Sequence, residues 1–134
     1  MKIRTATMAD LPAVPRLEAI CFPEAEAATE ASFARRLEVY PNHFWLMEDD
    51  NGTLVSFVNG LVTDEPHLRD EMYADAGFHD ENGAWQMIFG VDTHPDYRRQ
   101  GCAERLLNHA IAQSRAQGRK GLVLTCKERL VPVS

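Results

Sequence analysis

Apolar positions along this chain recur at two spacings, and these spacings predict its helices and strands. A period of three to four residues is typical of a helix with one buried face, whereas short alternating or wholly apolar runs are typical of strands. The predicted helices are residues 11–21, 30–40 and 102–117, and the predicted strands are residues 2–5, 43–48, 54–62, 85–91 and 121–126. The last strand, helix and strand have the spacing of a right-handed βαβ crossover, so the pattern predicts an α/β fold.

Residues that begin and end helices support these assignments. Thr7 begins a capping box and Thr29 is a second N-cap, while Gly118 is a natural helix C-cap. Asn51-Gly52 predicts a tight hairpin between the second and third strands. Pro15 falls inside the first predicted helix and is expected to kink or fray it.

Composition limits the classes of protein to which the chain can belong. With 134 residues, 45% of them apolar and 25% charged, it is expected to form one globular domain over residues 1–134. A net charge of −6 argues against a nucleic-acid-binding surface. No apolar run is long enough to span a membrane, and the N-terminus lacks a secretory signal, which predicts a cytoplasmic protein. Three scattered cysteines argue against a disulfide framework.

The junction between the 85–91 strand and the last helix carries the most specific chemistry. Arg98-Arg99-Gln100-Gly101-Cys102-Ala103 forms a polar turn that opens the helix. Free backbone N–H groups and the positive end of a helix dipole converge at such a turn, which favours a phosphate. Gly101 and Ala103 permit close approach to the backbone, and the two arginines add positive charge.

The pattern Arg-x-x-Gly-x-Ala, after a strand and before a helix, resembles the pyrophosphate loop of the GNAT N-acetyltransferase superfamily. His94-Pro95-Asp96-Tyr97 before the loop and Leu122–Cys126 after the helix fall where that family has corresponding segments. The run from Cys126 to Pro132 resembles the serotonin (arylalkylamine) N-acetyltransferase branch.

This resemblance implies a GNAT acyl-CoA N-acyltransferase fold, with a mixed central sheet flanked by helices, and acetyl-CoA as co-substrate. The pantetheine arm would lie where the two strands of the βαβ unit splay apart, beside Gly90, which is expected to mark a bulge or a close backbone approach. The residues implied for coenzyme A binding are Val91, Asp92, Thr93, Arg98, Arg99, Gln100, Gly101, Cys102, Ala103 and Glu104.

The sequence departs from the resembled branch at its proton-transfer positions. The paired histidines of that branch correspond to Met87 and Phe89, and Asp92 is expected to point away from the ligand. The thiolate-protonating tyrosine corresponds to Ser134, so the catalytic residues are unknown. The last helix and strands of the fold are expected to be missing, which would leave strand Gly121–Cys126 with an unpaired edge and predicts a homodimer through that edge.

The acceptor and metal sites are less defined by the sequence. The acceptor cleft is expected to be walled by Phe22, Pro23, Phe89, Gly90 and Thr125. Acidic residues between positions 63 and 83 predict a solvated helix and loop or, alternatively, an acceptor-side flap that attracts an amine. The five histidines lack metal-ligand spacing, so no metal is expected.

Three functions remain open at this stage. The first is N-acetyl transfer from acetyl-CoA to a small or peptidic primary amine by direct attack in a ternary complex. The second is a truncated relative that binds coenzyme A with little or no turnover. The third is an α/β interaction domain without a cofactor.

Overall fold

A computed structural model describes residues 1–124 and the backbone of residues 129–132. Its strands are β1 (Lys2–Thr5), β2 (Phe44–Glu48), β3 (Leu54–Asn59), β4 (Val62–Thr63), β5 (Trp85–Ile88), β6 (Gly90–Thr93), β7 (Gly121–Leu124) and β8 (Arg129–Pro132). Its α-helices are α1 (Ala13–Cys21), α2 (Glu30–Val39), α3 (Asp70–Ala74) and α4 (Cys102–Ala116). Four short 3-10 helices are η1 (Met8–Asp10), η2 (Pro41–His43), η3 (Ala76–Phe78) and η4 (Pro95–Tyr97).

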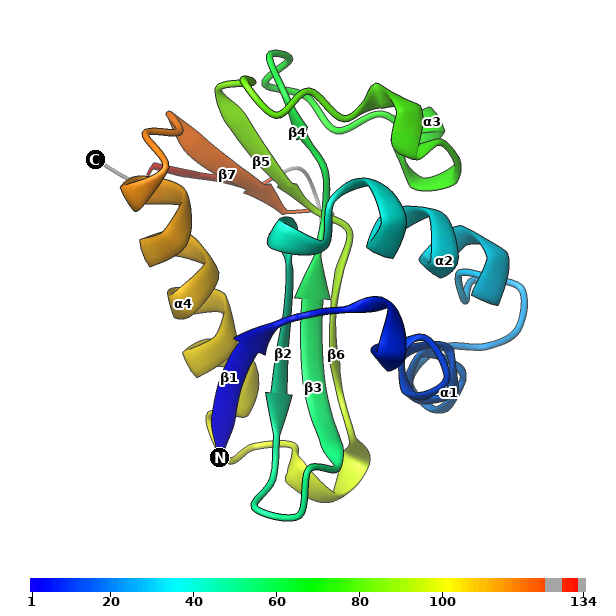
Figure 1. Cartoon of the computed structure of the whole chain (residues 1–134). Coiled ribbons are helices and arrows are strands. Elements are labelled where there is room, and N and C mark those ends of the chain that lie inside the picture. Colours follow the sequence, from blue (N-terminus) through cyan, green and yellow to red (C-terminus); the bar gives the residue numbers. More distant parts are fainter. Residues whose placement is uncertain (125–128, 133–134) are drawn as a thin grey trace.

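The strands form two four-stranded sheets in the orders β1-β2-β3-β6 and β4-β5-β7-β8. Among the described strands, only β5 and β7 pair in parallel, from Trp85 opposite Gly121 to Ile88 opposite Leu124, and α4 connects them as the predicted crossover. Helix α4 covers one face of the strands, and α1 and α2 cover the other (Figure 1). The α/β architecture with a mixed sheet between helices is therefore confirmed.

Two predicted strands are each divided where the chain passes from one sheet to the other. The 54–62 run is split between β3 and β4 at Gly60, and the 85–91 run is split between β5 and β6 at Phe89. The two crossings are hydrogen-bonded together, because the N–H of Phe89 donates to Asn59 O at 2.8 Å. The buried Gln86 side chain also donates to Gly60 O at 2.7 Å. Gln86 therefore holds the crossing together.

The crossing separates β6 from β7. Strand β6 pairs with β3 on one side, whereas β7 stays with β5 and β8. The predicted splay of the two βαβ strands is thus present, and in the described ranges no strand pairs with the other edge of β6.

Helix packing follows the sequence pattern closely. The predicted apolar stripe of α4 is buried at Leu106 and Ala110 against β2, β3 and β7. A second core lies between α1, α2 and the opposite sheet face, where Phe33 packs edge-on against Phe57 with ring centroids 5.7 Å apart. The Thr29 hydroxyl caps α2 by accepting the N–H of Ser32 at 3.1 Å. No helix in the described part of the chain is long and apolar enough to cross a membrane.

Two sequence predictions about this fold are wrong. Helix α1 begins at Ala13, after the separate turn η1, so Pro15 lies in its first turn, where a missing N–H breaks no helical hydrogen bond. The expected unpaired edge at Gly121–Cys126 is occupied within the described residues, because β8 pairs antiparallel with β7 from Gly121 opposite Pro132 to Leu124 opposite Arg129. Cys126 itself lies outside the described residues. The basis for a homodimer through this edge is therefore removed.

Candidate functional site

The N-terminus of α4 presents an uncovered group of backbone donors. The first helical bond of the Gly101 carbonyl comes from the N–H of Arg105 at 3.0 Å. Within the described residues, the N–H groups of residues 99–104 make no backbone hydrogen bond of good geometry. Gly101 has a φ of 78° and Arg99 a φ of 63°, both in the left-handed region, a conformation typical of turns whose successive N–H groups bind anions. This geometry suits an anion with several oxygens.

Side chains around this turn are arranged unequally. Arg99, Gln100 and Glu104 are exposed, whereas Cys102 is buried in the core beneath α4. Arg98 is turned back toward β6, and its Nε donates to Thr93 O at 3.3 Å. Both arginines are exposed at the turn, and Arg98 also bonds back to β6.

Strand β6 leads from this turn toward the splay. The N–H of His94 donates to Val55 O at 2.8 Å, so the alternation of an antiparallel ladder turns the backbone groups of Thr93 and Val91 away from β3. Thr93 O accepts from the Cys21 thiol at 3.4 Å as well as from Arg98. The edge of β6 therefore offers polar backbone groups beside the splay.

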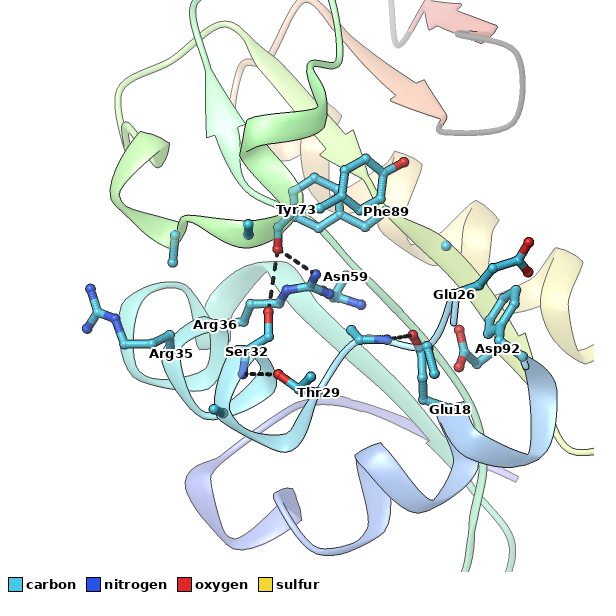
Figure 2. Close-up of a pocket in the computed structure, with 17 residues that line it drawn as sticks. Glu18, Glu26, Thr29, Ser32, Arg35, Arg36, Asn59, Tyr73, Phe89 and Asp92 are labelled. Carbon is cyan, nitrogen blue, oxygen red and sulfur yellow. Dashed lines mark hydrogen bonds between the residues drawn. The ribbon is translucent and has the colours of Figure 1, made fainter. Parts of the chain in front are cut away.

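On the side of α1 and α2, the chain encloses a cavity of about 680 Å³ (Figure 2). Three of the predicted acceptor residues, Phe22, Phe89 and Gly90, line it. Pro23 is not among its lining residues, and Thr125 lies outside the described residues. A Cβ at Gly90 would meet only Asp92 Oδ1, at 3.7 Å, so the expected close backbone approach is not found there and the space beside Gly90 stays open.

A buried cation occupies the centre of this cavity wall. Arg36 is 4% exposed, and its Nη1 donates to Asn59 Oδ1 at 3.0 Å while Nη2 donates to Tyr73 O at 3.0 Å. Its guanidinium carbon lies 5.1 Å from the centroid of the Phe33 ring and 4.8 Å from that of Phe89. The Nε group has no acceptor in the described part of the chain. Burial lowers the pKa of Arg36, but guanidinium begins so high that it stays charged.

Two buried carboxyl groups face the same cavity, Glu18 from α1 and Asp92 from β6. Glu18 Oε2 accepts the N–H of Ala28 at 2.8 Å, and Asp92 is 1% exposed. Burial, together with the neighbouring Glu18 carboxyl, raises the pKa of Asp92 to about 9. Two adjacent carboxylates out of water cannot both be ionised cheaply, so the pair holds a proton at neutral pH.

The sequence identified this group only in part, because the resemblance implied Asp92 for coenzyme A binding and not as an acid facing the acceptor cavity. It predicted that Asp92 points away from the ligand, whereas the structure places its side chain in the cavity wall. Glu18 and Arg36 were not predicted as site residues, although each is a charged residue beside apolar positions on the buried face of its helix. A charge on an apolar helix face is the one signal that could have revealed them, because unpaired charges are seldom buried.

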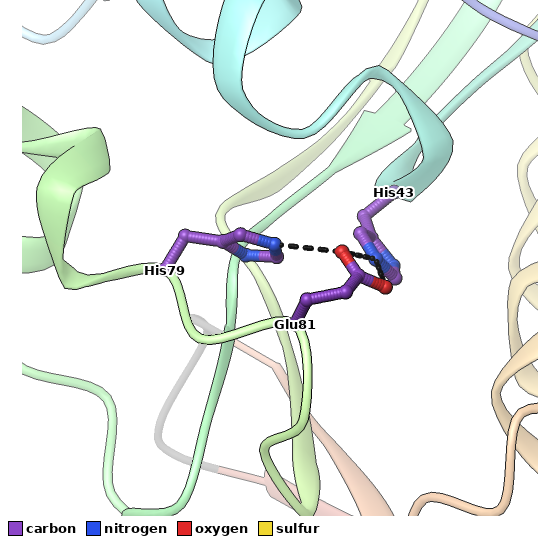
Figure 3. Close-up of side chains that lie close together, drawn as sticks. All are labelled: His43, His79 and Glu81. Carbon is purple, nitrogen blue, oxygen red and sulfur yellow. Dashed lines mark hydrogen bonds and ion pairs between the residues drawn. The ribbon is translucent and has the colours of Figure 1, made fainter.

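A third cluster brings together His43, His79 and Glu81, whose ligand atoms lie within 4.8 Å of one another (Figure 3). His79 Nδ1 accepts the N–H of Val62 at 3.0 Å, so its Nε2 carries the proton and donates to Glu81 Oε1 at 2.9 Å. His43 Nε2 lies 3.0 Å from both Glu81 oxygens, and Arg119 adds an ion pair at 3.2 Å. A protonated Nε2 cannot bind a metal, so these residues form a hydrogen-bond network in which Glu81 is the shared acceptor.

This network is expected to stabilise the fold. Burial raises the pKa of Glu81, but hydrogen bonds from His79 and His43 outweigh it and lower the pKa below its ordinary value. Replacing Glu81 by Ala would leave two ring N–H groups without an acceptor, which is expected to cost about 1–3 kcal/mol of unfolding free energy. Urea unfolding measures this loss, and Glu24→Ala, at an exposed position, is the control. An unchanged unfolding midpoint would show that the network contributes nothing.

Comparison with known proteins identifies the family to which this chain belongs. A sequence model described as the acetyltransferase (GNAT) family matches residues 11–131. No curated protein matches the chain. The structure of the GphF GNAT-like decarboxylase in complex with isobutyryl-CoA is 28% identical, with a TM-score of 0.83 over 92% of this chain.

Two further structures share the fold at lower identity. The loading GNATL domain of CurA from Lyngbya majuscula has a TM-score of 0.80 at 22% identity over 92% of this chain. The ribosomal-protein-S18-alanine N-acetyltransferase from Escherichia coli has a TM-score of 0.66 at 22% identity, again over 92%. The chain spans 65%, 63% and 64% of the lengths of these three structures, in the order given.

Proposed function

Since this chain belongs to the GNAT acetyltransferase family, we propose that it transfers an acyl group from coenzyme A, acetyl in the simplest case, to a primary amine by direct attack in a ternary complex. The observation that carries this proposal is the row of N–H groups at residues 99–104 that make no backbone hydrogen bond of good geometry within the described residues, together with the open edge of β6. The membership in the serotonin N-acetyltransferase branch remains a prediction.

Each part of the site would then have one task. The turn from Arg98 to Glu104 would hold the pyrophosphate, with the exposed Arg99 supplying charge. The outward backbone groups of Val91 and Thr93 would bond the pantetheine arm, with Asp92 between them in the strand. The cavity lined by Phe22, Phe89 and Gly90 would hold the acceptor. Because Gly90 has no side chain, space remains between the pantetheine arm and the acceptor cavity. The thioester carbon and the amine nitrogen can meet in that space.

Acetyl-CoA binding tests this proposal directly. Isothermal calorimetry is expected to show a single site, and Arg99→Glu is expected to weaken the affinity about tenfold or more, because it places a negative charge against the pyrophosphate. Arg16→Glu, an equal charge change at an exposed position of α1, is the control and should bind as the parent does. No heat of binding with the parent protein would refute the proposal.

A second candidate is decarboxylation of a carboxylated acyl-CoA, which the resemblance to the GphF decarboxylase supports. The buried positive charge of Arg36 in the cavity wall would attract a substrate carboxylate. Supplying malonyl-CoA without an amine separates the two functions. Acetyl-CoA formation and carbon dioxide release would favour this second reaction, whereas acylation of an amine panel would favour the first.

A further inference from the structure

We propose that Glu18 and Asp92 act as one proton-accepting unit for the acceptor amine. Without substrate the two carboxyl groups share a proton. The ammonium group of the acceptor replaces that proton when it binds, and the pair then takes a proton from the ammonium. This inference rests on the proposed acyl transfer to an amine. It assigns the recognition of the amine, and the route of its proton, to two residues that face the cavity from different elements.

The first support is the geometry of the pair. Both carboxyl groups line the cavity, Glu18 is 8% and Asp92 1% exposed, and they lie on the same side of it (Figure 2). Asp92 Oδ2 has no donor among the described residues, and Glu18 Oε2 is used by the N–H of Ala28. Two acceptor groups side by side need a hydrogen between them, and a shared proton supplies it.

Charge balance supports a singly charged cation as the ligand. The charged and titratable groups that face Asp92 are Glu18 and Cys21 from α1, Glu26 from the loop before α2, and Arg36 from α2. Glu26 is exposed to water, and burial and the Asp92 charge raise the pKa of the Cys21 thiol, which stays neutral. With one shared proton the carboxyl pair carries one negative charge, which Arg36 balances. An entering ammonium group adds a positive charge, and release of the shared proton balances it.

The proton balance of the reaction then closes. Binding of R–NH3⁺ expels the shared proton to solvent, and one ammonium proton moves to the carboxyl pair to give R–NH2. The nitrogen attacks the thioester carbonyl, so the C–N bond forms and the C–S bond breaks. The second nitrogen proton goes to the leaving thiolate. The pair ends with one proton, as it began, and one proton has been released overall.

The proton affinity of the ionised pair suits this step. Burial and the neighbouring Glu18 carboxyl raise the pKa of Asp92 above that of an exposed carboxyl, which makes the ionised pair a stronger base. An isolated carboxylate with an ordinary pKa would leave the ammonium charged. Burial of the pair therefore favours removal of the ammonium proton.

Infrared spectroscopy of the full chain tests the shared proton independently of turnover. At pH 7 the free protein is expected to show a buried carboxylic-acid C=O band that is absent in Asp92→Asn. Adding 2-phenylethylamine to the complex with coenzyme A should abolish the band. Asp50→Asn, at a side chain 98% exposed, should leave the band unchanged. Absence of the band, or its persistence at high amine concentration, would overturn the inference.

Steady-state kinetics with acetyl-CoA and the same amine give the second readout. Asp92→Asn and Glu18→Gln are each expected to lower kcat about 100-fold, and Glu18→Gln is expected to leave the affinity for acetyl-CoA within about twofold. Turnover within tenfold of the parent in folded Asp92→Asn would also overturn the inference. Failure of the parent to bind acetyl-CoA is a different result, because it would refute the proposed function and leave the infrared band as it is.

Discussion

The Asp92→Asn variant is expected to be more stable than the parent protein at neutral pH, by about 2–4 kcal/mol of unfolding free energy. The pKa of Asp92 is about 9 in the folded protein and about 4 in an unfolded chain. Between these values the folded state binds more protons than the unfolded state, so the stability of the parent falls as pH rises from about 4 to about 9. Asparagine does not titrate and can donate to Glu18, so the variant escapes this loss.

Urea unfolding at pH 5, 7 and 9 measures the effect. The stability difference between variant and parent is expected to grow with pH and to become constant above about pH 9. Asp50→Asn, on the 49–52 turn, should follow the pH dependence of the parent. Parallel curves for Asp92→Asn and the parent would mean that Asp92 is ionised at little cost in the folded protein. A gain in stability together with a loss of turnover is typical of a group retained for function.

Replacing Gly60 by Ala is expected to destabilise the chain by about 3 kcal/mol or more, which is a large part of the stability of a domain of this size. A Cβ at Gly60 would overlap the Met87 carbonyl, 1.8 Å from its oxygen and 2.4 Å from its carbon. These are backbone atoms of the neighbouring strand, so no side-chain rotation can relieve the overlap. The strands would have to separate at the point where the chain passes between the sheets.

Gly90→Ala is the matched control for this prediction. Gly90 lies on the strand that leaves the same crossing, but its added Cβ would meet only Asp92 Oδ1, at an ordinary contact distance of 3.7 Å. Its φ is not in the left-handed region. Thermal unfolding is therefore expected to change by less than about 1 kcal/mol for Gly90→Ala. Equal stability of the two variants would show that the crossing can open.

Local signals in the sequence determined most of the helices and turns. The period of apolar residues predicted α2 and α4, Thr29 predicted the start of α2, and Asn51-Gly52 predicted the hairpin between β2 and β3. These features depend on residues within about four positions of each other, so the chain carries them without reference to the rest of the molecule. The Arg98–Ala103 turn was found for the same reason.

Contacts between distant residues decided the rest. The sequence shows two continuous apolar strands, whereas the division of each at Gly60 and Phe89 arises from their mutual packing. The pairing of β8 with β7, and the meeting of His43 with Glu81, are likewise long-range.

The cavity also depends on contacts between residues that are distant in the sequence. Glu18 and Asp92 are 74 positions apart, and nothing in the sequence indicates that their carboxyl groups meet. Only the packing of α1 against β6 places the two carboxyl groups together out of water, and that burial holds a proton on Asp92. The sequence by itself determined where the turn that opens α4 lies, because that turn is built from consecutive residues. The tertiary structure alone decided which acids are buried, because a carboxyl pKa depends on the solvent and charges around it.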